Sequence, residues 1–507
     1  MLVGFYKTLL KKRWISKKNK IYQYIRYKVT NIMNRKPLLL FATVAFLLVV
    51  EFFLFKDLPF FWDGISKAYR ASYLYDTNLS NLILPTAYSS GHPPLWIASL
   101  AIFWKVFGKT LWASRLLLLL VNIGVFYQLL VLCKQHFKSS VPLVLFLFVC
   151  LDPTIIAQTT SLNNDMLLLF FTLMSFNALQ KNSWMWYALA LTGLLLTNLR
   201  GIYCFVALIL IHIIYNRKRL LEWKSNMLRS YAIATLTFVI FLIFQYTELG
   251  WVLFTKNENF SKHREAASGF RVVKNTAAFV KYVLDFGRVF LWIPLLFFLL
   301  KFYRNKQWAL DVNSQKTGIA LLVFTGVFFL GFVPFSNPMG PRYLMVCYIL
   351  AAVLFINLLF TVSEKRKTRN SILLIVAAGL ISGHFWIYPA TISQGWDSSL
   401  AYLGYFDKEE KMLKFLKDKK IEPSQVGTNI PINGRGLARL SKENTIEEKF
   451  PPLDLASNPY VLFSNIENDT DDATINTLRT QWEEIKTYER LGVFITLYKR
   501  PEVPAVK

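Results

Sequence analysis

Cysteines are few in this sequence, and acidic residues are scarce outside its last part. All four cysteines lie in apolar stretches, at Cys133, Cys150, Cys204 and Cys347. A disulfide framework is therefore not indicated. Residues 390–507 hold 18 of the 31 Asp and Glu residues but only 16 of the 58 Lys and Arg residues. The basic excess thus lies in residues 1–389, beside apolar stretches, which is typical of membrane topology and argues against nucleic-acid binding.

Long apolar runs are what the sequence has in abundance. The 507 residues are 54% hydrophobic and 16% aromatic, and the apolar runs repeat at the length of a membrane-spanning helix, roughly 20 residues. The sequence therefore predicts an all-α polytopic membrane bundle with about eleven transmembrane helices. The expected spans are 37–55, 112–133, 141–157, 165–180, 184–199, 200–215, 230–247, 287–300, 317–335, 341–361 and 371–389.

The charges of the connecting loops decide the number of crossings. With eleven spans and a cytoplasmic N-terminus, the basic clusters at 134–138, 217–229, 301–316 and 365–369 all face the cytoplasm. A twelfth crossing at 93–107 would turn these clusters outward. We therefore expect that stretch, which opens with two prolines, to lie as a helix in the outer interface.

Three regions follow from this topology. Residues 1–36 carry eleven Lys and Arg and no acid, which predicts a basic cytoplasmic arm or only a topology signal. A transmembrane domain over 37–389 has long outer loops at 56–111 and 248–286. Residues 390–507 alternate turn signals with short regular runs, which predicts a small extracytoplasmic α/β domain. Strand-like runs lie at 425–430, 460–464 and 491–498, and helix-like runs at 407–419 and 472–480.

Two aspartates begin helical stretches on the outer side. Asp63 follows the first span, and Asp165 starts the fourth span from outside. In one interpretation each carboxylate caps its helix by accepting backbone N–H groups. In the other, both acids are catalytic, and Asp63 is a general base that deprotonates an acceptor hydroxyl. Their common side of the membrane favours the second interpretation.

Several basic residues on the outer side break the positive-inside rule. Arg200 lies in an outer turn and Arg342 at the mouth of the tenth span, while His263 and Arg264 lie in the loop 248–286. These residues are expected to bind a lipid phosphate and to stabilise its charge as it leaves. The alternative is attraction to anionic headgroups together with snorkelling of the long side chains.

His92 and Arg115 are the remaining candidates for substrate binding. The two prolines after His92 hold its backbone extended. His92 is interpreted as a substrate contact, as an interfacial residue without a role, or as a metal ligand together with His263. Two histidines without a third ligand make a poor zinc site, so no cofactor is expected and a divalent metal stays the weaker alternative. Arg115, at the outer start of the second span, is a candidate because intramembrane charges are often functional.

Taken in chain order, these motifs resemble a known family. The motifs are the acid after the first span, HPPLW before a helix ending KVFGKTLWASR, then NND, TNLRG and PRYL. They resemble, over about residues 37–361, the polyprenyl-phosphate-sugar glycosyltransferases of the GT-C fold. That family includes the bacterial aminoarabinose transferases and the protein O-mannosyltransferases. The resemblance implies that a sugar is transferred with inversion from a lipid monophosphate, such as undecaprenyl phosphate, drawn from the outer leaflet.

The resemblance also implies roles for individual residues. Asp63 matches the catalytic aspartate of the first loop, and Asp165 matches the second acidic position. Arg200 resembles the basic residue of a Lys-Gly turn, and Arg342 with Tyr343 resembles a late basic-tyrosine motif.

Two positions depart from the family pattern. Gly64 follows the aspartate where the family often has glutamate. His92 matches the His-Pro-Pro-Leu form of the mannosyltransferases, whereas the aminoarabinose enzymes have a Glu-Lys pair there whose lysine contacts phosphate. Arg200, Arg264 or Arg342 would have to supply that cation.

The expected protein is a glycosyltransferase in a bacterial inner membrane, surrounded by membrane lipids and with no nucleic-acid partner. Its donor would be a polyprenyl-phosphate sugar, and its acceptor an extracytoplasmic glycan, glycolipid or protein. A transporter or flippase is the main alternative, although it would be expected to place ions near the bilayer midplane, often in paired repeats. A scaffold in which Asp63 and Asp165 are dispensable is a third hypothesis, and an enzyme with a diphosphate donor is a near neighbour.

Overall fold

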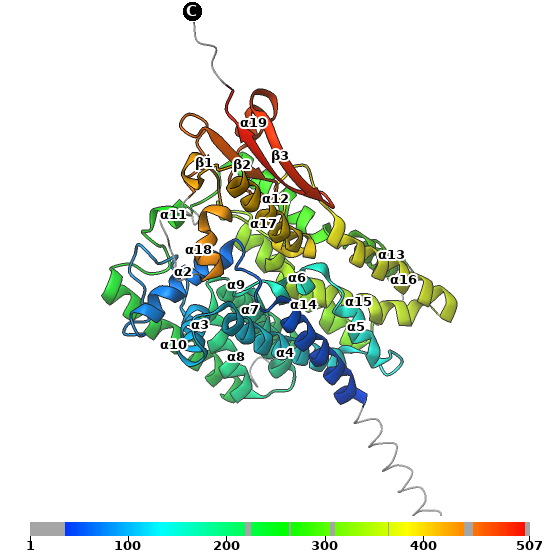
Figure 1. The fold of residues 1–507 in the computed structure, drawn as a ribbon. Coiled ribbons are helices and arrows are strands. Elements are labelled where there is room, and N and C mark those ends of the chain that lie inside the picture. The colour runs from blue at the N-terminus through cyan, green and yellow to red at the C-terminus, as the bar shows by residue number, and fades with distance from the viewer. Residues whose placement is uncertain are drawn as a thin grey trace, which may run out of the picture.

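The computed structural model describes residues 36–217, 225–262, 265–304, 310–363, 365–440 and 450–501. The predicted basic arm lies outside these residues except for Lys36, and so do His263 and Arg264. The described chain is mostly helical, with a small sheet near its C-terminal end (Figure 1).

The helices follow one another from the first described residue onward. They are Lys36–Phe55, α2 (Asp63–Asp76), α3 (Leu95–Phe107), α4 (Leu111–His136), α5 (Phe146–Val149), α6 (Pro153–Thr160), α7 (Asp165–Gln180), α8 (Trp184–Thr197), α9 (Arg200–Tyr215), α10 (Ser225–Leu249), α11 (Glu258–Ser261), α12 (Gly269–Leu284), α13 (Val289–Arg304), α14 (Val312–Phe332), α15 (Met345–Val362), α16 (Arg366–Ser382), α17 (Leu403–Asp418), α18 (Arg435–Arg439) and α19 (Asp472–Gln481).

Within the described ranges, five helices are long and apolar enough to cross a membrane, and up to seven if each of two bent pairs counts as one span. The five are Lys36–Phe55, α4, α10, α14, and α15 with the 3-10 turn η4 (Pro341–Leu344) that precedes it. The other predicted spans α7, α8, α9 and α16 are helices of only 14 to 17 residues. The polytopic helical fold is thus present, whereas the number of eleven crossings stays a prediction.

One of the predicted spans is broken by a bend, and another directly follows a bend. The span expected at 141–157 is broken into the stretch Leu143–Val149 and α6, which are bent by 75°. Asp152 explains the break, because its carboxylate accepts the backbone N–H of Thr154 at 2.9 Å and caps the new helix. The span expected at 287–300 lies in α13, which is bent by 89° from α12. The sequence predicted neither bend.

The C-terminal region contains the expected mixture of helix and strand. Four strands, β1 (Val426–Gly427), β2 (Tyr460–Ser464), β3 (Glu483–Arg490) and β4 (Val493–Lys499), form a sheet in the order β1-β2-β4-β3. The β1–β2 pair is parallel, and the pairs with β4 are antiparallel, with Leu462 opposite Leu497. The sequence did not predict β3, and β1 is shorter than expected.

The hydrophobic core of the C-terminal region includes a residue from the segment just before α2. Phe61 is buried together with Trp396, Tyr402 and Phe406, and its ring lies 4.7 Å from that of Tyr402. In Figure 1 the sheet and α17 stand at one end of the molecule, and α18 contacts α17 there through Arg439 and Glu409. The C-terminal region therefore packs directly on the segment that leads into α2.

Candidate active site

Asp63 and Asp165 come together because two helix starts pack closely. Asp63 is the first residue of α2 and Asp165 the first of α7. A Cβ atom at Gly64 would lie only 3.0 Å from the carbonyl oxygen of Leu162, so glycine permits α2 to approach the chain just before α7. Glycine at position 64 thus has a steric reason.

Arg342 is the centre of the site, because it faces three carboxylates from distant parts of the sequence. Its guanidinium donates hydrogen bonds to Asp63 and to Asp397, and its Nε lies 3.2 Å from Oδ2 of Asp165. Arg342 lies in the turn η4. Gly395 packs closely against this turn, since a Cβ atom at Gly395 would lie only 2.5 Å from Cδ of Pro341. This packing of Gly395 on Pro341 brings Asp397 to Arg342.

A second arginine, Arg200, also binds one of these carboxylates. Arg200, the first residue of α9, donates to Oδ1 of Asp165 at 2.5 Å. Its guanidinium also lies 3.8 Å from the ring centre of Tyr343, whose ring lies 5.2 Å from the guanidinium of Arg342. Asp165 is 1% exposed as a side chain, so its charge is compensated by both arginines rather than by water.

The cluster opens into a cavity of about 460 Å³. Asp63 is the accessible acid of the cluster, since its side chain is 49% exposed while that of Asp397 is 8% exposed. The cavity combines residues of α2 and its neighbouring loops, of η4 and of the C-terminal region. Its charged and imidazole side chains are Asp63, Lys67, Arg70, His92, Arg342, Asp397 and Asp469. A cavity of this size with converging polar groups is the usual form of a small-molecule site.

The surroundings shift the pKa values of these groups in opposite directions. Burial raises the pKa of Asp63, but the positive charges of Arg342 and Lys67 outweigh it and lower the pKa to about 2. Burial, together with the nearby charge of Arg70, lowers the pKa of Lys67 to about 7. Burial also raises the pKa of Asp397, against the opposing effect of Arg342. At neutral pH Asp63 is therefore ionised, and Lys67 is only partly protonated.

Neither aspartate caps a helix with its side chain. The residue before α2 is Trp62 and the one before α7 is Asn164, and neither helix has a side-chain hydrogen bond at its cap. The carboxylates of Asp63 and Asp165 bond to arginines instead. Trp62 has a positive φ of 47°, an uncommon conformation for a bulky residue, and its indole donates to the carbonyl oxygen of Ile466 at 3.1 Å. The start of α2 is thus held by the C-terminal region.

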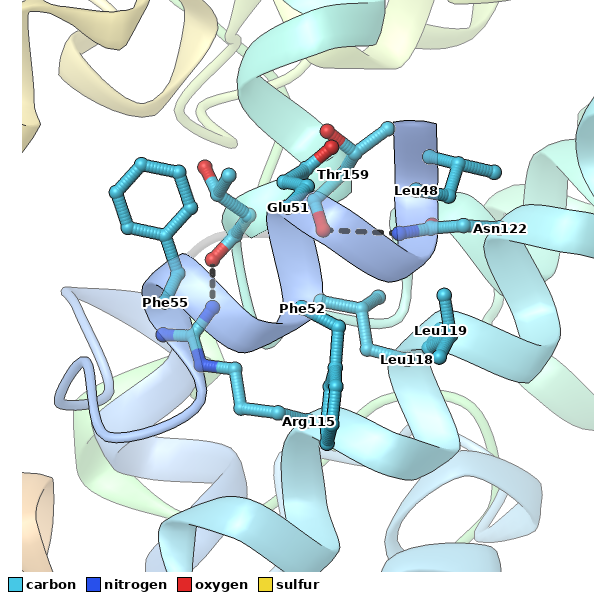
Figure 2. A pocket seen from close by; sticks show the side chains of 10 residues that line it. Leu48, Glu51, Phe52, Phe55, Arg115, Leu118, Leu119, Asn122 and Thr159 are labelled. Carbon is cyan, nitrogen blue, oxygen red and sulfur yellow. Dashed lines mark hydrogen bonds between the residues drawn. The ribbon is translucent and has the colours of Figure 1, made fainter. Parts of the chain in front are cut away.

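The other predicted binding residues divide into two groups. His92 lines the cavity, whereas Arg115 does not and is occupied elsewhere. Its guanidinium donates to the carbonyl oxygens of Leu58 at 2.8 Å and Pro59 at 3.2 Å, and also to that of Thr160. Figure 2 shows Arg115 at a small pocket between the first helix and α4, which Glu51 also lines. Arg115 therefore positions the backbone that leads to Asp63. It does not lie with the other residues predicted to bind phosphate.

Sequence reasoning missed four charged residues of the cavity. Lys67 and Arg70 lie one and two turns after Asp63 on α2, so the helical spacing was an available signal. Asp397 and Asp469 come from the C-terminal region, and nothing local in the sequence marks them. In the described part of the chain, no group of three or more His, Cys, Asp and Glu side chains is arranged to hold a metal ion.

Comparison with known proteins identifies the fold. No protein-family model and no curated protein matches the sequence. Two solved structures of ArnT from Cupriavidus metallidurans are similar, one bound to undecaprenyl phosphate and one in the apo state. The TM-scores are 0.51 and 0.52 at 11% and 12% sequence identity, and each match covers 91% of this chain and 97% of ArnT. The chain has the ArnT fold. The resemblance inferred from the motifs is thus confirmed at the level of the fold. Because each match covers 91% of the chain, the similarity extends beyond residues 37–361 into the C-terminal region.

Proposed function

We propose that the chain is a membrane glycosyltransferase that uses a polyprenyl-phosphate sugar as its donor. One observation carries the proposal: a half-exposed, ionised carboxylate, Asp63, lies beside the guanidinium of Arg342 in a cavity that also holds Lys67 and Arg70. A base next to cations is what displacement of a lipid phosphate by an acceptor hydroxyl requires. The ArnT fold supports the choice of donor, because ArnT has been solved with undecaprenyl phosphate bound.

The cations of the cavity would hold the phosphate of the donor. Arg342, Lys67 and Arg70 are within one cavity, and charge-assisted hydrogen bonds to phosphate are among the strongest that side chains make. His92 lines the same cavity and would contact the substrate there. As the bond between the anomeric carbon and the phosphate oxygen breaks, these residues stabilise the negative charge that develops on the departing polyprenyl phosphate.

Asp63 would act as the general base. The acceptor hydroxyl or amine attacks the anomeric carbon, a new bond forms there, and the proton passes to the Asp63 carboxylate. The pKa of about 2 describes Asp63 while Arg342 is bound to it. A bound phosphate competes for the guanidinium, frees the carboxylate and adds a nearby negative charge, so the pKa of Asp63 rises toward the range of an effective base.

The shared cavity supports the proposed sidedness of the chain. Asp63 from the first outer loop and Asp397 and Asp469 from the C-terminal region reach the same solvent-accessible space. We therefore assign the region 390–507 to an extracytoplasmic α/β domain next to the transmembrane domain 37–389. The positive-inside bias of the loops supports a cytoplasmic N-terminus, and a bacterial inner membrane is the proposed location. The C-terminal region contributes Asp469 to the cavity and is in a position to contact the acceptor.

Incubation of membranes containing the chain with a polyprenyl-phosphate sugar, labelled in the sugar, tests this function. We expect the label to leave the donor lipid and to enter a glycan, glycolipid or protein fraction while polyprenyl phosphate accumulates. Consumption of a polyprenyl-diphosphate sugar in place of the monophosphate would contradict the donor. Movement of intact labelled donor across the bilayer, without loss of its sugar, would contradict the reaction and favour a flippase.

A further inference from the structure

A second cavity, of about 590 Å³, lies between the end of α16 and the C-terminal sheet. It shares no residue with the active-site cavity. Most of its wall is apolar and comes from the turn after α16, the segment around the start of α17, and the turn between β3 and β4. The hydrophobic side chains that line it are Ile381, Phe385, Ile387, Leu400, Ala401, Leu403, Leu491 and Val493.

An exposed apolar stripe runs along α16 into this cavity. Leu374 is 71% exposed, Ile381 49%, and Phe385, in the 3-10 turn η5 (Gly383–Phe385) that continues the helix, 63%. Spacings of seven and four residues place these side chains on one face of a helix. Leu491, on the other side of the cavity, is 70% exposed. A continuous exposed apolar surface of this kind is typical of contact with lipid chains.

Basic side chains stand at the polar end of the cavity. Lys408 and Lys411 come from α17 and Arg490 from β3, and Asp407 is the single acid among the lining residues. Lys411 pairs with Asp407 at 2.8 Å, and Lys408 donates to the carbonyl oxygen of Gly404 at 2.6 Å. The lining therefore has an excess of positive charge directly beside an apolar wall.

We infer that this cavity binds an anionic phospholipid from the surrounding leaflet. The acyl chains would lie along the α16 stripe and enter the apolar wall, and the phosphate would meet Lys411 and Arg490. The apolar surface accounts for the chains and the basic end for a negative headgroup, which together match an anionic amphiphile. Binding at this site does not depend on the proposed transferase activity, because none of its residues lines the active-site cavity.

Titration of the purified full-length chain in detergent with phosphatidylglycerol and with phosphatidylcholine, read by native mass spectrometry, tests this inference. We expect phosphatidylglycerol to bind about 25-fold more tightly than phosphatidylcholine, since each of the two cations near the lipid headgroup contributes roughly fivefold. The double variant Lys411→Gln/Arg490→Gln should remove that preference. Lys414→Gln is the matched control, because Lys414 is an exposed lysine of the same helix outside the cavity lining, and it should leave the preference unchanged.

A third variant tests whether the lipid chains occupy the cavity itself. Gly404 lines it, and a Cβ atom there would have its nearest neighbour, Nζ of Lys408, at an ordinary 3.7 Å. Gly404→Leu therefore adds a side chain to the cavity wall without a backbone clash, and it should weaken binding of both phospholipids about tenfold. Equal binding of the two lipids by the unmodified chain would overturn the inference. Unchanged phosphatidylglycerol binding by the double variant would do the same, whatever the behaviour of Gly404→Leu.

Discussion

Arg288 and Arg342 both bind carboxylates from distant parts of the chain, yet only one of the two clusters meets solvent. Arg288 has no exposed surface, and it forms two hydrogen bonds of 2.6 and 2.9 Å to the carboxylate of Asp152. The ring of Tyr348 covers its guanidinium at 3.6 Å. Arg342 instead faces three carboxylates, those of Asp63, Asp165 and Asp397, at the wall of a cavity of about 460 Å³.

We interpret this difference as one between a structural and a functional ion cluster. The Arg288–Asp152 pair is balanced in charge and closed to water, and it ties the bend between α12 and α13 to the start of α6. The cluster around Arg342 brings together three carboxylates at a cavity, and one of them is accessible. Interacting charges that line a cavity are typical of a site that acts on a ligand. Charge-removing variants should therefore affect stability in the first cluster and activity in the second.

The largest expected effect is on sugar transfer by Asp63→Asn. Removal of a general base lowers the rate typically by about 10²- to 10⁴-fold, and the half-exposed amide should leave the thermal stability nearly unchanged. The measurement is the rate at which labelled sugar leaves the polyprenyl phosphate. Asp76→Asn, at the far end of α2 in an exposed pair with Lys109, is the matched control and should keep the full rate. Equal rates for the two variants would remove Asp63 from the mechanism.

Arg288→Met should have the largest effect on stability. Breaking a buried ion pair from one side costs about 3–5 kcal/mol, because the carboxylate of Asp152 is left without its partner. The half-life of the detergent-solubilised chain at a fixed elevated temperature measures the loss. The double variant Asp152→Asn/Arg288→Met should recover much of it, since asparagine still caps α6 and carries no charge. A double variant as unstable as Arg288→Met would show that the ion pair is not the cause.

Asp397→Asn should have a smaller effect, confined to the catalytic rate. Asp397 positions Arg342, and a hydrogen bond to a charged group contributes about 1.5–3 kcal/mol, or roughly tenfold to a hundredfold in rate. The KM for the donor should stay the same or fall, because a negative charge near the phosphate is removed. A raised KM with an unchanged kcat would contradict the positioning role. Asp418→Asn, on the exposed end of α17, serves as the control.

Local sequence patterns sufficed for the parts of the structure that local forces determine. The runs at 37–55 and 112–133 became the helices Lys36–Phe55 and α4 because predominantly apolar stretches of that length favour helix in a membrane. The run at 141–157 contained Asp152 and Pro153, and that helix-starting pair outweighed the hydropathy of the run and produced a bend. Strand β3, with the sequence EEIKTYER, lacks an apolar alternation and is held by its pairing with β4.

The site could be predicted only where its residues follow membrane topology. Asp63, Asp165, Arg200 and Arg342 stand at the outer ends of predicted spans, and the structure brings them into one cluster. Arg115 also stands at the outer end of a predicted span, but its guanidinium donates to the backbone carbonyl groups of Leu58 and Pro59 and does not join the cluster. Asp397 enters the site through tertiary packing of the chain at Gly395 on η4, which has no periodic signature in the sequence.

The smallest expected effect, a pH dependence of donor binding, would sharpen the contrast between the two clusters further. The pKa of Lys67 is lowered to about 7, so the fraction of charged lysine falls as the pH rises from 6 to 8. Loss of that charge weakens a hydrogen bond to phosphate by roughly 1 kcal/mol, so the KM for the donor should rise about fivefold over this range. Lys67→Arg stays charged throughout and should give a flat profile. An equal rise of the KM in Lys67→Arg would assign the pH dependence to another group.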